Sequence, residues 1–162
     1  MRRYIFKAGI LLSTLYAMVC MWHWKSGFTY FTQLSNLFVA GVVISQLLRP
    51  GVKTARWKYA ATVSITVTFL VYLLVLAPMI PGGLIAAYAQ DHWASFCLHI
   101  LTPLLTIADF FLIDAPEGTW RNRDLLYAAL PPVLYFLLIL LLGLSGMRWG
   151  MGTMTAPYMF LN

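Results

Sequence analysis

Polar and ionisable residues recur along the fourth apolar segment of the chain at helical spacing. Separated by three, four, three, four and three residues, they are His92, Ser95, His99, Thr102, Thr106 and Asp109. On a helix these steps place all of them on one face, which we expect to face the interior of a bundle because polar groups are costly in lipid. The stripe indicates either the lining of a polar cavity or a set of contacts that hold helices together.

A second polar patch lies at the start of the second apolar segment. Thr29, Thr32 and Asn36 share one helical face there, and Gln33 lies beside them. The following residues, 37–44, are apolar. We therefore expect the patch to be confined to one end of its helix and to contribute to the same polar cavity.

Thr32 and His99 have the types and positions that could do chemistry together. Thr32 lies about four residues into its segment and His99 about six, so at 1.5 Å per residue their depths differ by only ~3 Å. A threonine hydroxyl attacks well only if a base removes its proton, and an imidazole can be that base. We interpret Thr32 as a candidate nucleophile and His99 as its base, with Asn36 or Gln33 steadying an oxyanion. The alternative is a structural Thr–His hydrogen bond.

Three other residues of the fourth segment have different expected roles. Asp109 lies ten residues beyond His99, about 15 Å along a helix, so it cannot orient the imidazole. We expect it to pair with a basic loop residue or to take a proton. His92 is either a cavity residue or an interfacial histidine. Pro103 lacks a backbone N–H and predicts a kink near His99.

Five apolar segments must position these residues. They cover approximately residues 4–21, 28–48, 57–77, 93–113 and 126–145, and each can cross a hydrocarbon core of roughly 30 Å. The chain has 162 residues, of which 61% are hydrophobic and 10% charged. A soluble domain of this size buries only roughly 68–70% of its surface, too little to hide so many apolar groups. We predict an all-α fold in which residues 1–162 form one polytopic transmembrane helical bundle of about five spans.

The basic residues indicate an orientation for this bundle. Nine lysines and arginines belong to the N-terminal region and the second and fourth loops, and two belong to the opposite side. Cytoplasmic loops collect such residues, which predicts a cytoplasmic N-terminus. The net charge of +6 has the same explanation. We expect no nucleic-acid partner, because the basic residues occupy short loops rather than one exposed face.

Three stretches of the sequence resemble bacterial Pr-six-Pr integral membrane proteins. The stretches are Tyr30-Phe31-Thr32-Gln33-Leu34-Ser35-Asn36-Leu37, Leu98-His99-Ile100-Leu101-Thr102-Pro103-Leu104-Leu105 and Ala108-Asp109-Phe110. That group is similar in turn to the androgen-induced gene family of animals, whose members hydrolyse fatty acid esters of hydroxy fatty acids within the membrane. The resemblance implies a threonine nucleophile at Thr32 and a histidine at His99.

The sequence departs from these relatives at two points. They have six spans, so we expect a sixth span to be missing here. Ser35-Asn36 stand where the animal proteins usually have an acidic residue.

Three functions are compatible with the sequence. The first is an intramembrane hydrolase of lipid (fatty acid) esters in the bacterial cytoplasmic (inner) membrane, with Thr32 and His99 as catalytic residues. The second is a non-catalytic lipid-binding protein or proton-coupled carrier that uses His99 and Asp109. The third is a membrane assembly component, whose polar stripe docks a helix from a second copy or another partner. We expect no cofactor and no metal, since two intramembrane histidines seven residues apart are too few ligands.

Overall fold

The computed structural model describes residues 2–21, 27–50, 54–114, 122–149, 152–158 and 161. The described helices are α1 (Arg2–Cys20), α2 (Phe31–Leu48), α3 (Ala55–Val71), α4 (Gly83–Phe96), α5 (Thr102–Asp109) and α6 (Asn122–Leu144). Short π-helical segments follow α3, α4 and α5 at Tyr72–Leu76, Cys97–Leu101 and Phe110–Asp114, and 3-10 turns occupy Gly27–Thr29 and Ala77–Met79. Within these residues the only β-type pairing is an isolated bridge between Trp149 and Met154.

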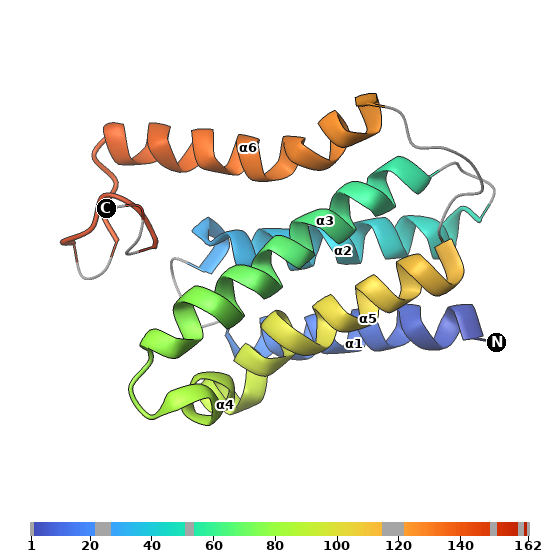
Figure 1. Cartoon of the computed structure of the whole chain (residues 1–162), viewed down its shortest axis with the longest axis horizontal. Helices are drawn as coiled ribbons and strands as arrows, with labels where there is room; N and C mark the ends of the chain where they lie inside the picture. Colours follow the sequence, from blue (N-terminus) through green and yellow to red (C-terminus); the bar gives the residue numbers. More distant parts are fainter. Residues whose placement is uncertain are drawn as a thin grey trace.

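Five of the described helical stretches are long and apolar enough to cross a membrane. They are Arg3–Cys20, Phe31–Leu48, Ala55–Met79, Gly83–Asp114 and Asn122–Leu144. Consecutive stretches run in opposite directions along the bundle (Figure 1). The all-α bundle and its five apolar helices are therefore confirmed, and they indicate a multi-pass membrane protein.

The fourth stretch differs from the prediction near its start. Helix α4 begins at Gly83, but the backbone leaves helical geometry at Gln90 and has positive φ at Asp91, His92 and Trp93. His92 therefore does not continue the helical stripe that contains His99, and the prediction that placed it there was wrong. The seven-residue step assumed an unbroken helix, whereas positive φ at three consecutive residues turns the chain sharply.

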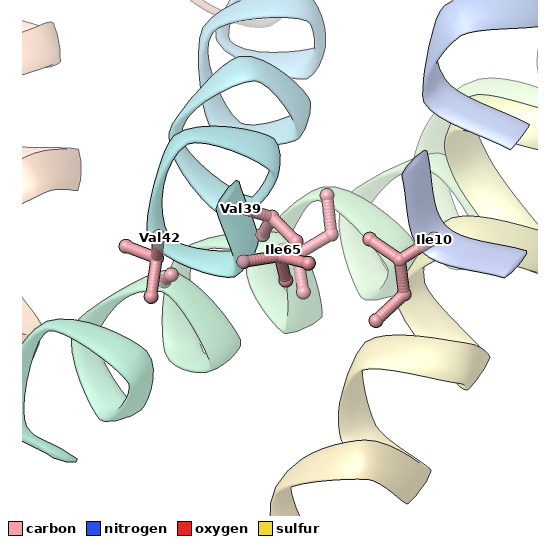
Figure 2. Close-up of a cluster of buried hydrophobic side chains, with 6 residues drawn as sticks. Ile10, Val39, Val42 and Ile65 are labelled. Carbon is pink, nitrogen blue, oxygen red and sulfur yellow. The ribbon is translucent and has the colours of Figure 1, made fainter. Parts of the chain in front are cut away.

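The apolar core lies where α1, α2 and α3 meet. It contains the buried residues Ile10, Val39, Val42, Val43, Ala61 and Ile65, of which Figure 2 labels four. All six are alanine or β-branched residues, whose short side chains let the three helices pack closely. Helix α5 packs against α1 and α3, and α6 packs along α3 at the edge of the bundle (Figure 1). Only 11% of the apolar stretch of α6 is buried, as expected for a helix that faces lipid.

Four charged residues join α1, α3 and the end of α5. Lys7 Nζ lies 2.7 Å from Asp109 Oδ2 and 2.6 Å from Asp114 Oδ2, and Lys58 Nζ lies 2.5 Å from Asp109 Oδ2. Lys7, Lys58 and Asp109 are fully buried. Asp109 thus has basic partners, as expected. They lie within helices rather than in a loop because α3 begins at Ala55, before Lys58. We call these four residues the ion cluster.

Candidate functional site

Thr32 and His99 are in contact at the opposite end of the bundle from the ion cluster. Thr32 lies in the first turn of α2 and His99 in the π-helical segment Cys97–Leu101, with 3.3 Å between Thr32 Oγ1 and His99 Nε2. Both side chains are buried, at 7% and 8% exposure. The residues that the sequence placed at matched depth are therefore within hydrogen-bonding distance. Their catalytic roles stay a prediction.

The other ring nitrogen of His99 fixes which way that hydrogen bond points. Nδ1 lies 2.8 Å from the main-chain carbonyl oxygen of Ser95. A carbonyl can only accept, so Nδ1 carries a proton and Nε2 of the neutral ring keeps a lone pair. The Thr32 hydroxyl therefore donates to Nε2, which is the arrangement a general base requires. A main-chain carbonyl occupies the place that a carboxylate has in a Ser-His-Asp triad.

Tyr72, the first residue of the π-helical segment after α3, holds His99 in this orientation. Its ring stacks on the imidazole, with 3.5 Å between ring centroids and 14° between planes. Its hydroxyl donates to the Ala87 carbonyl at 2.9 Å and lies 2.7 Å from Ser95 Oγ. Because the Tyr72 proton is already donated, the Ser95 hydroxyl must donate to Tyr72. Ser95 Oγ therefore has no proton for the imidazole, and its 3.3 Å distance to His99 Nδ1 is longer than the 2.8 Å hydrogen bond from Nδ1 to the Ser95 carbonyl.

The helix is distorted around His99, where Pro103 predicted a kink. The Thr102 N–H donates to the Cys97 carbonyl, five residues back, instead of to Leu98. This register leaves the Leu98 carbonyl free to accept from Asn36 Nδ2 at 3.2 Å. Asn36 Nδ2 also donates to the Thr32 carbonyl at 2.8 Å. Asn36 therefore ties the start of α2 to the distorted segment.

A residue that follows α6 completes the surroundings of Thr32. The Tyr158 hydroxyl oxygen accepts the Phe31 N–H at 3.0 Å. Its ring packs edge-on against Tyr30, with centroids 5.6 Å apart. Burial raises the pKa of the Tyr158 phenol, so the phenol keeps its proton at neutral pH.

Thr29 helps to hold this end of the chain in place. Its Oγ1 accepts from Trp149 Nε1 at 2.9 Å, and its carbonyl accepts from the Tyr135 hydroxyl at 2.9 Å. A second contact holds the residues after α6 against that helix. The Thr155 carbonyl packs so closely on Gly143 that a Cβ added to Gly143 would lie 2.5 Å from the carbonyl oxygen. Thr29 thus anchors the residues after α6 rather than lining the cavity beside His99.

Two cavities meet beside Thr32. The first, which we call the polar cavity, has a volume of about 470 Å³ and is lined by Gln33, Asp91, Ser95 and His99 among others. The second, which we call the apolar cavity, has a volume of about 240 Å³ and lies between α3 and α6, with Val67, Val71, Tyr135 and Phe136 in its walls. Thr32, Tyr72, Leu76 and Tyr158 line both. Thr32 Oγ1 therefore stands between a polar and an apolar compartment.

Gln33 is a buried amide in the wall of the polar cavity. The side chain is 5% exposed and lines the cavity, and its Oε1 atom has no hydrogen-bond partner within the described part of the chain. A buried amide without partners is costly unless something else satisfies it. Gln33 Oε1 can therefore accept a hydrogen bond from a bound molecule. Asn36 Oδ1 also has no partner among the described residues, but Asn36 does not line the cavity and both of its amide hydrogens are already donated.

Four residues of the predicted stripe lie away from the polar cavity: His92, Thr102, Asp109 and Thr106, whose hydroxyl donates to the Thr102 carbonyl at 2.8 Å. His92 is exposed, and its carbonyl accepts from the Tyr16 hydroxyl at 2.7 Å. Thr102 is fully buried, with its Oγ1 atom 2.8 Å from Ser13 Oγ. Asp109 belongs to the ion cluster. Of the stripe, only Ser95 and His99 line the polar cavity.

Sequence reasoning missed Tyr72 and Tyr158. Tyr72 offered a weak signal, because a tyrosine near the outer end of the third apolar segment needs a hydroxyl partner at that depth. Tyr158 offered none, since its contacts depend on how the chain folds back after α6.

No model of a known protein family, no curated protein and no solved structure significantly matches this chain.

Proposed function

We propose that this protein is an intramembrane hydrolase of lipid (fatty acid) esters, with Thr32 as nucleophile and His99 as general base. The observation that carries the proposal is the directed pair of hydrogen bonds through His99. Nδ1 donates to the Ser95 carbonyl, and Nε2 faces Thr32 Oγ1 at 3.3 Å. The resemblance of the Thr32 and His99 stretches to Pr-six-Pr proteins and the androgen-induced gene family supports the same assignment.

The reaction would proceed in two halves. Thr32 Oγ1 bonds to the ester carbonyl carbon while its proton moves to His99 Nε2. When the tetrahedral intermediate collapses, the C–O bond to the alcohol breaks and that oxygen takes the proton from Nε2. A water then attacks the acyl-threonine, gives its proton to Nε2, and the acid leaves as Thr32 recovers its proton. Gln33, which lines the polar cavity, would donate to the oxyanion through its side-chain NH₂ group.

The paired cavities support a lipid substrate. An acyl chain that leaves the bilayer would enter the apolar cavity between α3 and α6. The apolar side chains of this cavity would replace the lipid tails as its surroundings. The ester carbonyl would then lie at Thr32, and the more polar part of the molecule would occupy the polar cavity. The partner is therefore a membrane lipid or fatty acid ester rather than a water-soluble ester.

The proposed location is the cytoplasmic membrane of a bacterium, with the N-terminus inside. The nine-to-two distribution of lysines and arginines supports this orientation. The ion cluster then lies near the cytoplasmic face and Thr32 near the outer face, so the substrate would enter from the outer leaflet.

Covalent labelling with a fluorophosphonate probe, combined with hydrolysis of a fatty acyl 4-nitrophenyl ester, tests the proposal on detergent-purified protein. Thr32→Ala and His99→Ala should each lower both signals by about 10³-fold or more, because the nucleophile and base act as a unit. The matched controls are Thr66→Ala, whose hydroxyl bonds only to the Thr62 carbonyl, and His92→Ala, an exposed histidine. Both should keep wild-type rates. Absence of labelling and hydrolysis in a folded wild-type sample would refute the proposal.

A further inference from the structure

Gln33 lies beside the candidate nucleophile, in the first turn of α2. Its side chain is buried and lines the polar cavity together with Thr32 and His99. An amide oxygen can only accept hydrogen bonds, and Gln33 Oε1 has no donor within the part of the chain that the structure describes. Because a buried acceptor without a partner is costly, this wall of the cavity lacks a hydrogen-bond donor.

The polar groups around the reacting pair do not provide that donor. Thr32 donates to His99 Nε2, and His99 Nδ1 donates to the Ser95 carbonyl. The Ser95 hydroxyl donates to the Tyr72 hydroxyl, 2.7 Å away. The hydrogens of these groups are therefore used within the protein. A molecule bound in the polar cavity is placed to supply the hydrogen that Gln33 Oε1 lacks.

The cavity that Gln33 lines defines which part of a substrate it meets. Gln33 belongs to the wall of the polar cavity and not to that of the apolar cavity, whereas Thr32 lines both. In the proposed reaction, the acyl chain occupies the apolar cavity and the alcohol part of the ester occupies the polar one. Gln33 is therefore on the side of the alcohol part.

We propose that Gln33 determines substrate specificity by accepting, through Oε1, a hydrogen bond from a hydroxyl group on the alcohol part of the ester. The preferred substrates are then fatty acyl esters of a diol or polyol, such as glycerol, that keep a free hydroxyl next to the ester-bearing carbon. The assignment rests on the proposed hydrolase activity. The hydroxyl only donates a hydrogen bond, so no covalent bond to it forms or breaks and each step of the reaction stays balanced.

The two ends of one amide suit this arrangement. In the tetrahedral intermediate, the oxyanion and the alcohol oxygen are attached to the same carbon, so a hydroxyl next to the ester-bearing carbon lies close to the oxyanion. Gln33 Nε2 can therefore donate to the oxyanion while Oε1 accepts from the hydroxyl. An ester whose alcohol part is pure hydrocarbon leaves Oε1 unpaired. Enzymes discriminate strongly against substrates that leave a buried polar group unpaired in this way.

The rival explanation is that an ordered water in the polar cavity satisfies Gln33 Oε1. A water would serve esters with and without a hydroxyl alike, so no preference between them would depend on Gln33. Two esters that differ by a single hydroxyl group, 2-hydroxypropyl decanoate and propyl decanoate, separate these explanations.

Release of decanoate from each ester by the full chain in detergent provides the test. Wild-type kcat/KM should be about 10- to 100-fold higher for the 2-hydroxypropyl ester, because the propyl ester leaves a buried acceptor unpaired. Gln33→Met, which has a similar size and no accepting oxygen, should abolish this preference. Gln33→Glu keeps an accepting oxygen and should keep the ratio within about threefold of wild type.

Gln46→Met is the matched control. Gln46 is equally buried in α2, and its Oε1 atom also has no partner among the described residues, but it does not line the polar cavity. This variant should therefore keep the wild-type ratio. Each ratio compares two esters on one variant, so the loss of the Gln33 NH₂ group, which lowers kcat for both esters, does not affect it.

Three results overturn the assignment while hydrolysis that depends on Thr32 continues. The first is a wild-type protein without preference between the esters. The second is a preference that persists in folded Gln33→Met or disappears equally in Gln46→Met. The third is loss of the preference in Gln33→Glu, which would show that the hydroxyl accepts from the NH₂ group instead. A wild-type protein that hydrolyses neither ester overturns the proposed function, and the Gln33 assignment falls with it.

Discussion

Replacing Asp109 with asparagine should destabilise the protein strongly. Asp109 Oδ2 lies 2.7 Å from Lys7 Nζ and 2.5 Å from Lys58 Nζ, and all three side chains are fully buried. With Asp114 the ion cluster has two positive and two negative charges, so asparagine leaves one buried positive charge without compensation. Breaking a buried ion pair from one side costs about 3–5 kcal/mol.

Thermal unfolding of the detergent-purified protein measures this effect. For a chain of this length, 1 kcal/mol corresponds to about 2–4 °C, so Asp109→Asn should lower Tm by roughly 6–20 °C. The matched control removes one charge of each sign. Asp109→Leu combined with Lys58→Met leaves the 2.6 Å pair between Lys7 and Asp114 intact, and apolar replacement of a complete buried pair is often neutral. The double variant should therefore recover most of the lost Tm.

Two results would refute this reasoning. An Asp109→Asn protein that unfolds at the wild-type temperature would show that the lysines adopt their neutral forms or reach water at little cost. A double variant as unstable as Asp109→Asn would show that the loss comes from packing rather than from unbalanced charge.

Two further predictions concern the site. Ser95→Ala should keep kcat within about tenfold of wild type, because a main-chain carbonyl and not the hydroxyl holds the His99 proton at Nδ1; a loss as large as that of His99→Ala in ester hydrolysis would contradict this. Val71→Phe should fill part of the apolar cavity and raise KM for 4-nitrophenyl decanoate by about tenfold while sparing the acetate; equal effects on both esters would show that the acyl chain binds elsewhere.

The five spans could be predicted because each depends on a local property. A run of apolar residues long enough to cross a bilayer is visible in the sequence, and the first three predicted segments agree with the helices to within a few residues. The start of the fourth stretch could not be predicted in this way, because it depends on a turn in the backbone. Asp91, His92 and Trp93 have positive φ without a glycine among them, so no residue type marked the turn.

The site was partly predictable for the same reason. Thr32 and His99 could be paired because depth along two helices follows from residue count. The partners of His99 could not be predicted. One is the main-chain carbonyl of Ser95, which no residue type reveals, and the other, Tyr72, reaches His99 from another helical segment. The ion cluster could be predicted only in part. A charged Asp109 required a basic partner, but which lysines bury themselves beside it depends on how α1, α3 and α5 pack.

The bundle has buried polar groups at two ends, the ion cluster and the Thr32–His99 pair, and these groups are stabilised in different ways. In the ion cluster the charges balance and the groups hold one another, although Asp109 Oδ1 has no hydrogen-bond partner among the described residues. Between the two ends, Thr102 and Ser13 satisfy each other across α5 and α1. The groups in direct contact with Thr32 are uncharged in the arrangement observed, and Gln33, whose Oε1 atom has no partner among the described residues, lines the adjoining cavity. Buried atoms without a partner among the described residues also occur elsewhere, at Thr14, Gln46 and Asp109 for example. Gln33 differs from these three residues because its side chain lines the cavity that also contains Thr32 and His99. That placement, rather than the presence of buried polar residues, supports the proposal that a ligand binds at the Thr32 end.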